Sequence, residues 1–263
     1  SFNAMAEFTK AIGGDKVEVS TIIPDGVEPH DFELKPENMK QLATAQVFVY
    51  NGFGMEPWAK QAIEAAKNDK LVTVVATEGV EAIKNTDPEE IKEHGAEDPH
   101  AWLSLKDAKI EVKNIKDALV KADPANKDYY EKNYTEYVGK LDAMIKKYEE
   151  QFAKAPHKNF VTGHAAFAYL SRDFGLEQNS VEDVFAEGVP NAAQLAKLIE
   201  YVKENNIKTI FAEEMASPEV SKTLAKEVGA KVETIYTIES KEDDKTYLQR
   251  MDENLAKILE SLK

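Results

Sequence analysis

Residues 124–154 read PANKDYYEKNYTEYVGKLDAMIKKYEEQFAK, and this stretch decides how the rest of the chain is organised. It contains a single glycine, Gly139, and no proline after Pro124. Tyrosine and aliphatic residues recur at spacings of three and four, the period of one helix face: Tyr130, Tyr134, Val138, Leu141, Ile145 and Tyr148. The pattern predicts one long amphipathic helix of about eight turns. Because average helices are much shorter, we expect this helix to join two halves of the chain.

Strand-like and helix-like runs alternate on both sides of this helix. Apolar, β-branched runs that predict strands occupy residues 16–23, 47–50, 71–75, 159–162, 209–212 and 232–236. Helical runs occupy residues 35–45, 55–68, 165–172, 192–205, 217–228 and 246–262. Such alternation is typical of parallel sheets flanked by helices. We therefore expect an α/β fold with an N-terminal lobe (1–122), a linking helix (123–155) and a C-terminal lobe (156–263).

The composition narrows the range of partners. The chain of 263 residues has 33 basic and 48 acidic residues, a net charge of −15, and this charge disfavours nucleic acid and anionic membrane surfaces. It has no cysteine, so histidine and carboxylate side chains must supply any zinc ligands. No apolar run reaches the length of a membrane helix. The sequence starts at Ser1-Phe2 without a methionine, and we expect a leader, with or without a lipid anchor, to precede it.

Two histidines share one local motif, an acidic residue followed by proline and histidine. The motif occurs as Glu28-Pro-His30 and as Asp98-Pro-His100. Proline fixes the backbone just before the imidazole and lowers the entropy lost when the ring binds a ligand. A nearby carboxylate can accept the second ring N–H and set the tautomer. The motif predicts that His30 and His100 are metal ligands.

A third histidine, His164, follows the predicted strand 159–162 through a glycine. Ligands of open α/β sheets gather at the carboxyl ends of strands, so we expect His164 to join His30 and His100. His157 lies in a polar connection and His94 in the acidic stretch 87–98. We interpret both of these histidines as exposed.

The remaining ligand of the site is an oxygen donor. Glu239 follows the predicted strand 232–236, and Glu213 follows the strand 209–212. We favour Glu239 as the fourth ligand and Glu213 as a residue beside the site, with Glu213 or water as the alternative fourth ligand. Three imidazoles and one oxygen form a set that suits Zn²⁺.

Several of these motifs together resemble the cluster A-I solute-binding proteins of zinc and manganese ABC importers. The resemblance covers essentially the whole chain. It rests on GVEPHDFE (26–33), VYNGFGMEPW (49–58), DPHAWL (98–103), TGHAAF (162–167) and the run from Ser217 to Ala230.

The resemblance implies two lobes of four-stranded parallel sheet bridged by one rigid helix, with the metal in the cleft between them. It implies that His30 and His100 come from the first lobe, and His164 and Glu239 from the second. Histidine at the third ligand position favours zinc, because carboxylate-rich sets suit Mn²⁺. The resemblance thus implies an extracytoplasmic, monomeric binding protein that delivers zinc to a membrane permease and is not an enzyme.

Three alternatives remain open. A manganese-binding member of the same family would use the same fold. A zinc hydrolase would need an open coordination position and a general base, but the chain has neither a His-Glu-x-x-His helix nor a Gly-x-Ser-x-Gly elbow. A surface adhesin would leave no chemical signature in the sequence.

Overall fold

The computed structural model describes residues 1–85, 91, 95–184, 192–213 and 218–263. These residues form two compact units. The first unit comprises 1–102, 106–142 and 238–247, and the second comprises 103–105, 143–237 and 248–263. The predicted long helix is present as α6 (Lys127–Lys154), which passes from the first unit into the second at Asp142. It begins after a 3-10 turn over Pro124–Asn126.

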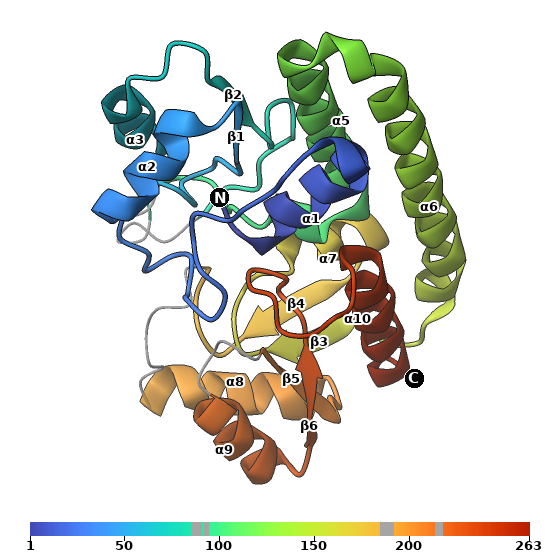
Figure 1. The fold of residues 1–263 in the computed structure, drawn as a ribbon. Coiled ribbons are helices and arrows are strands. Elements are labelled where there is room, and N and C mark those ends of the chain that lie inside the picture. The colour runs from blue at the N-terminus through green and yellow to red at the C-terminus, as the bar shows by residue number, and fades with distance from the viewer. Residues whose placement is uncertain (86–90, 92–94, 185–191, 214–217) are drawn as a thin grey trace. The chain divides into compact units, whose positions relative to one another are not determined.

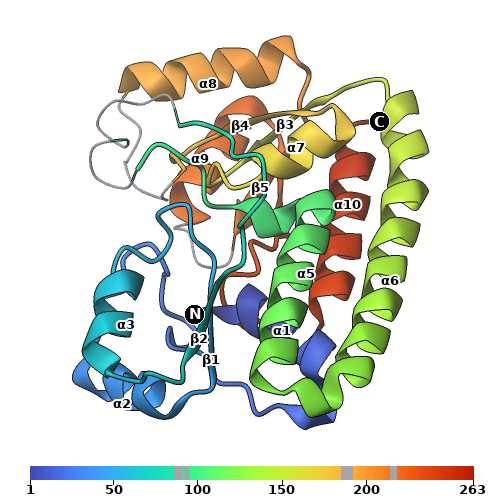
Figure 2. The same ribbon diagram turned by 90° about the horizontal axis from the view of Figure 1, so that it is seen from above.

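Helices and short parallel strands make up the first unit. Its elements are α1 (Asn3–Gly13), a 3-10 turn (Gly14–Lys16), α2 (Pro36–Thr44), β1 (Val47–Tyr50), α3 (Ala59–Ala66), β2 (Val72–Val75), and, apart from residues 103–105, a 3-10 turn (Ala101–Leu103) and α5 (Leu105–Ala122). Figures 1 and 2 both show α5 beside the first part of α6. Ion pairs join the two helices, with Lys109 Nζ at 2.5 Å from Asp142 and Lys116 Nζ at 3.0 Å from Glu131.

The sheet of the first unit differs from the expectation. Among the described residues it contains only β1 and β2, which pair in parallel from Val47 opposite Val72 to Tyr50 opposite Val75. The strand predicted over 16–23 is wrong, since these residues join no described ladder. Apolar, β-branched residues gave the signal, but a strand needs a neighbour to bond. Here a cavity of about 560 Å³ is lined both by residues 16–20 and by β1.

A four-stranded parallel sheet forms the centre of the second unit, in agreement with the expectation. Its strand order is β4-β3-β5-β6. The elements are β3 (Asn159–Thr162), α7 (Ala168–Phe174), β4 (Glu177–Ser180), α8 (Ala192–Glu204), β5 (Thr209–Glu213), α9 (Pro218–Val228), β6 (Lys231–Ile235) and α10 (Tyr247–Ser261). Strand β5 is buried along its whole length and packs against α9. The core around it includes Val161, Val202, Ile210 and Leu224. The α/β class with helices flanking parallel strands is therefore confirmed.

One segment returns the chain from the second unit to the first. Residues 238–247 follow β6 and belong to the first unit. The backbone N–H of Asn3 donates to the carbonyl of Glu239, and the hydroxyl of Tyr247 donates to the carbonyl of Trp102. The expectation that Glu239 belongs to the second lobe is therefore wrong. The resemblance placed it there, but the long-range hydrogen bond from Asn3 ties it to the first unit.

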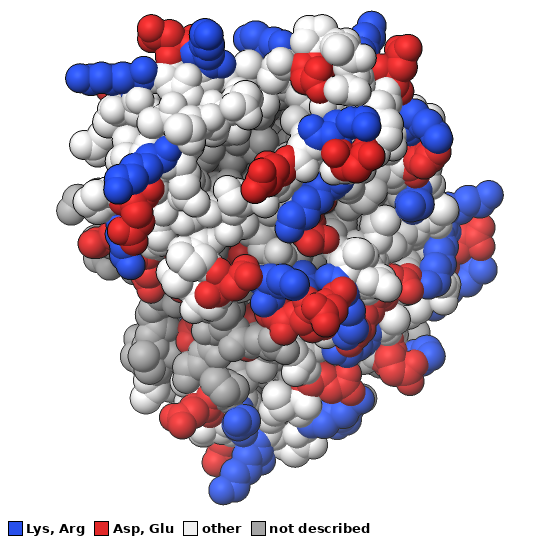
Figure 3. All heavy atoms as spheres, in the orientation of Figure 1, with Lys and Arg blue, Asp and Glu red and all other residues white. Residues whose placement is uncertain are grey.

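One face of the molecule carries charges of both signs (Figure 3). On the face in Figure 3, lysine and arginine side chains are interspersed with aspartate and glutamate. Among the described helices, none has the length and apolar character needed to cross a membrane.

Candidate metal centre

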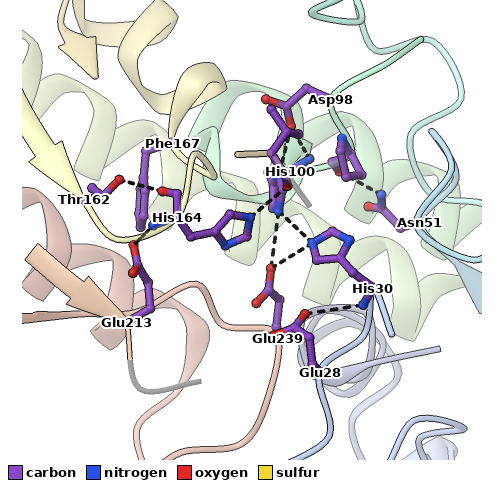
Figure 4. Close-up of polar contacts among 12 residues, drawn as sticks. Glu28, His30, Asn51, Asp98, His100, Thr162, His164, Phe167, Glu213 and Glu239 are labelled. Atoms are coloured by element: carbon purple, nitrogen blue, oxygen red, sulfur yellow. Dashed lines mark hydrogen bonds and ion pairs between the residues drawn. The ribbon is translucent and has the colours of Figure 1, made fainter. Parts of the chain in front are cut away.

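Two imidazoles and one carboxylate converge in the first unit. Nε2 of His30 lies 3.2 Å from Nε2 of His100, and Oε1 of Glu239 lies 3.4 Å from His100 Nε2 and 3.8 Å from His30 Nε2. Figure 4 shows the three side chains pointing toward one another. All three are at most 1% exposed in their side chains. The structure therefore brings together three of the predicted ligands from segments far apart in the sequence.

The spacing of these three atoms fits a tetrahedral metal. Bonds of roughly 2.0–2.1 Å from zinc to nitrogen or oxygen place neighbouring ligand atoms about 3.3–3.4 Å apart. The triangle formed by His30 Nε2, His100 Nε2 and Glu239 Oε1 has sides of 3.2, 3.4 and 3.8 Å. Its donors are two nitrogens and an oxygen, which suit zinc chemically. The geometry and the chemistry of the triangle thus fit one face of a zinc tetrahedron.

The acid-Pro-His motif orients His100 as predicted. Oδ1 of Asp98 accepts hydrogen bonds from Nδ1 of His100 at 2.8 Å and from the backbone N–H of His100 at 2.9 Å. The amide of Asn51 donates to the carbonyl of Pro99 at 2.8 Å and fixes the loop before the ring. With its proton on Nδ1, the neutral ring keeps its lone pair on Nε2, the atom that faces His30 and Glu239.

The same motif works differently at His30. Oε1 of Glu28 accepts a hydrogen bond from the backbone N–H of His30 at 3.4 Å. The carboxylate of Glu28 also lies close to ligand atoms of His30 and Glu239, all within 4.8 Å of one another. Glu28 is therefore a further candidate oxygen ligand. From the sequence we expected it only to orient the imidazole of His30. Its place directly before the Pro-His pair was a signal for this role.

Buried charges of opposite sign shift the pKa values in the site. Burial and the neighbouring Glu239 raise the pKa of Glu28 to about 8. Burial alone would lower the pKa of His100, but Asp98 and Glu239 outweigh it and raise this pKa to about 9. The site thus holds protons in the absence of a metal and has to release them when a cation binds.

His164 belongs to the second unit and lies where it was predicted, just past the carboxyl end of β3. Its Nε2 is 2.8 Å from the carbonyl of Val184. Because a carbonyl only accepts, Nε2 carries the proton and the lone pair of the neutral ring falls on Nδ1. The helix predicted over 165–172 begins only at Ala168, so His164 lies in the loop before it. A hydrogen bond from Thr162 Oγ1 to the carbonyl of His164 stabilises this loop.

Glu213 lies beside His164, at the end of β5. Its Oε1 accepts a hydrogen bond from the backbone N–H of His164 at 3.2 Å. An added Cβ at Gly163 would lie 2.4 Å from Oε2 of Glu213. Glycine is therefore required between β3 and His164 for the close approach of this carboxylate. Glu213 thus contacts the backbone of His164, and its role beside the site stays a prediction.

The other two histidines lie away from this constellation or outside the described structure. His157 is exposed, as predicted. His94 and the acidic residues 87–90 lie outside the described residues. The sequence reasoning missed Asn3, whose amide donates to the carbonyl of Ile238 at 3.3 Å, directly before Glu239. An asparagine at a helix start gave no signal for this contact, because its partner is 235 residues away.

Converging imidazoles and carboxylates in an α/β unit define a metal-binding protein. Comparison with known sequences identifies its family. The profile of the periplasmic component A of zinc-uptake complexes matches residues 1–261. The chain is 42% identical to the high-affinity zinc uptake system protein ZnuA of Bacillus subtilis, over 100% of this chain and 86% of the relative. It is 38% identical to the zinc-binding lipoprotein AdcA of Streptococcus pneumoniae, over 97% of this chain and 53% of the relative.

Solved structures give the same result. The metal-dependent lipoprotein YcdH of Bacillus subtilis superposes with a TM-score of 0.85 at 41% identity, over 99% of this chain and 97% of that one. The laminin-binding adhesin Lmb of Streptococcus agalactiae superposes with a TM-score of 0.90 at 31% identity, over 100% and 98% of the two chains.

The chain belongs to the family of periplasmic zinc-uptake components. Members of this family are zinc-binding components of ABC importers at the periplasm or cell surface, and they are not enzymes. The expected class, location and metal are therefore confirmed, and the zinc hydrolase alternative is excluded by the family.

Proposed function

We propose that this chain captures Zn²⁺ with His30, His100, His164 and Glu239 and hands it to the permease of a cognate ABC importer. The observation that carries the proposal is the triangle of His30 Nε2, His100 Nε2 and Glu239 Oε1, with sides of 3.2 to 3.8 Å. Neutral imidazoles and one carboxylate suit zinc as ligands. Because only the carboxylate is charged, the complex with Zn²⁺ keeps a net positive charge, which a nearby anionic side chain can balance. Glu28 supplies a second carboxylate for that balance.

His164 is the proposed third imidazole. Its support is local: the loop after β3 presents the ring, and the carbonyl of Val184 holds the Nε2 proton, which directs Nδ1 toward a ligand role. In this proposal the first unit holds three of the ligands and the second unit supplies one. The division into a lobe (1–122), a linking helix (123–155) and a lobe (156–263) is part of the same proposal, with the exception of residues 238–247, which belong to the first unit.

Calorimetric titration with Zn²⁺ and Mn²⁺ tests the metal and the ligand set. We expect the wild type to bind Zn²⁺ more tightly than Mn²⁺, because imidazoles suit zinc better. The His164→Glu variant should lose zinc affinity and narrow this preference, and the Glu239→Ala variant should bind both metals more weakly. His157→Ala is the matched control, since His157 is exposed, and should bind like the wild type. Tighter binding of Mn²⁺ by the wild type would refute the zinc assignment.

Delivery to a permease, a monomeric state and a lipid anchor are further parts of the proposal. The relative named as a zinc uptake system protein supports delivery to a permease. The relative named as a zinc-binding lipoprotein supports a lipid anchor. Light scattering of the purified chain with and without zinc tests the monomeric state. Zinc-dependent binding to membranes that contain the candidate permease tests delivery.

Adhesion is a second candidate function. A solved structure at 32% identity belongs to a laminin-binding protein of Streptococcus agalactiae that is described as bifunctional, with adhesin and metal-transporting activity. We propose to test binding of this chain to immobilised laminin with and without zinc. No binding above that of a protein of equal charge would remove this candidate.

A further inference from the structure

Ile238, the residue before Glu239, has an unusual backbone conformation. Its φ angle is +62°, in the left-handed region. The non-glycine residues with positive φ in the described part of the chain are Phe53, Lys67, Asn206 and Ile238. Lys67 and Asn206 lie just after helices, where a left-handed residue is common. A β-branched residue in this region is a true outlier, because its Cβ crowds the following carbonyl.

Several long-range contacts hold this outlier in place. The Asn3 side-chain amide donates to the carbonyl of Ile238, and the Asn3 backbone N–H donates to the carbonyl of Glu239, both at 3.3 Å. The backbone N–H of Gly26 donates to Oγ of Ser240 at 2.7 Å. The side chain of Ile238 is fully buried. Sparsely populated conformations persist where the surrounding structure fixes them in this way, and they cluster at functional sites.

The strained residue also lies at a boundary. Thr237 is the last residue of its segment in the second unit, and Ile238 is the first of the segment 238–247 in the first unit. The residue that follows it, Glu239, contributes the carboxylate of the metal triangle. Hinges are a few residues in loops or at the ends of elements that absorb a change in backbone angles. A change of φ at Ile238 would redirect the Glu239 backbone and its side chain together.

We propose that Ile238 is a positioning residue for Glu239. Its left-handed backbone, clamped by the hydrogen bonds from Asn3 and from Gly26, keeps the carboxylate against His30 and His100. Relaxation of Ile238 to an ordinary conformation withdraws the carboxylate and lowers the affinity for zinc. The strain thus gives the site a built-in route to metal release. This inference rests on the proposed zinc-binding function and adds to it the residue that controls the oxygen ligand.

The test compares Ile238→Gly with Ile238→Ala by competition with a fluorescent zinc chelator. Both variants remove the buried side chain beyond Cβ, but only glycine adopts positive φ without a penalty. Metal binding needs the clamped state, so a smaller population of that state weakens the apparent affinity in proportion. We expect the glycine variant to bind zinc about fivefold more tightly than the alanine variant.

Two controls separate positioning from general stability. The same pair of changes at Lys67, which has φ of +50° at the end of α3, should shift the melting temperature and leave zinc affinity unchanged. In a Glu239→Gln background, the glycine and alanine variants at position 238 should bind zinc equally, because the carboxylate to be positioned is gone.

The clamp offers a second, milder test that leaves Ile238 intact. Asn3→Asp replaces the donating amide with an acceptor opposite the Ile238 carbonyl and should weaken zinc binding several-fold. The matched control is Asn38→Asp, since Asn38 is also buried and its amide donates to the carbonyl of Ile22 at 3.2 Å. It should lower stability without a comparable loss of zinc affinity.

The outcomes distinguish this inference from the proposed function. If the wild type fails to bind zinc, the proposed function itself is wrong. If the wild type binds zinc, but Asn3→Asp binds as well as Asn38→Asp, or Ile238→Gly and Ile238→Ala bind equally, the positioning role is wrong. A glycine-to-alanine difference that persists in the Glu239→Gln background would assign Ile238 a purely structural role.

Discussion

Oδ1 of Asp98 accepts two hydrogen bonds from the same residue, His100, one from ring Nδ1 at 2.8 Å and one from the backbone N–H at 2.9 Å. The two bonds fix both the rotation of the ring and its tautomer, so that Nε2 faces His30 and Glu239. The carboxylate also makes the ring more basic. The acid-Pro-His motif is thus a compact device for presenting an imidazole.

Neutralising Asp98 should weaken zinc binding. We expect the Asp98→Asn variant to lose about 10- to 100-fold in affinity, the usual effect of removing a carboxylate that orients a metal-binding histidine. Competition against a zinc chelator measures this loss. Asp31→Asn is the control, because Asp31 directly follows the ligand His30 in sequence but is exposed. An equal loss in both variants would point to net charge rather than to orientation.

Zinc binding should release protons and tighten as the pH rises. Asp98 and Glu239 raise the pKa of His100 to about 9 despite its burial, so the metal-free ring carries a proton at pH 7 that zinc must displace. We expect about one proton from this ring and an affinity that increases with pH until about pH 9. Calorimetry in buffers of different ionisation enthalpy counts the protons. Affinity that is flat from pH 6 to 9 would contradict this assignment.

Removal of zinc should lower thermal stability. Free zinc at a concentration 100-fold above the Kd stabilises the folded state by about 2.7 kcal/mol. For a chain of this size we expect a chelator to lower the melting temperature by about 5–10 °C. Scanning fluorimetry measures the change. The His100→Ala variant should show little response to the chelator, whereas His157→Ala should respond like the wild type.

Glu111 in α5 should destabilise the fold at neutral pH. Burial and the nearby Asp107 and Glu56 raise its pKa well above the ordinary value, and neither carboxyl oxygen has a hydrogen-bond partner among the described residues. Because the pKa of Glu111 is higher in the folded than in the unfolded chain, the folded state is favoured while this carboxyl is protonated, below about pH 4.5. This contribution to stability is lost as the pH rises through the folded-state pKa.

The Glu111→Gln variant should therefore melt higher than the wild type at pH 8, with a smaller gain at pH 5. Melting curves at both pH values test this expectation. Glu136→Gln on the exposed face of α6 should show no such pH dependence. A gain for Glu111→Gln that is equal at both pH values would argue for packing as the cause.

Gly163 should tolerate no side chain. An added Cβ would meet Oε2 of Glu213 at 2.4 Å, so Gly163→Ala must displace the carboxylate that accepts the His164 backbone N–H. We expect this variant to lose stability by about 1–3 kcal/mol. Gly139→Ala in α6 meets nothing within 4 Å and should gain about 0.5–1 kcal/mol through helix propensity. Urea unfolding measures both changes.

Much of the fold followed from local patterns. Three- and four-residue spacing predicted α6, and the apolar centre of β5, residues 210–212, predicted that buried strand. Strand β4 was missed because its sequence, EQNS, is polar and it is set by its pairing with β3. The strand predicted over 16–23 was wrong for the opposite reason: its residues favour a strand, but they have no ladder partner among the described residues.

Composition and local motifs specify the ligand chemistry. The chain has no cysteine, and the repeated acid-Pro-His motif and the glycine before His164 each lie within a few consecutive residues. Tertiary structure alone decided which carboxylate meets His30 and His100. Glu239 reaches them because Asn3 and Gly26 bind the segment 238–240 to the first unit, and Ile238 adopts a left-handed backbone to allow it. These contacts join residues more than 200 positions apart, and no local pattern encodes them.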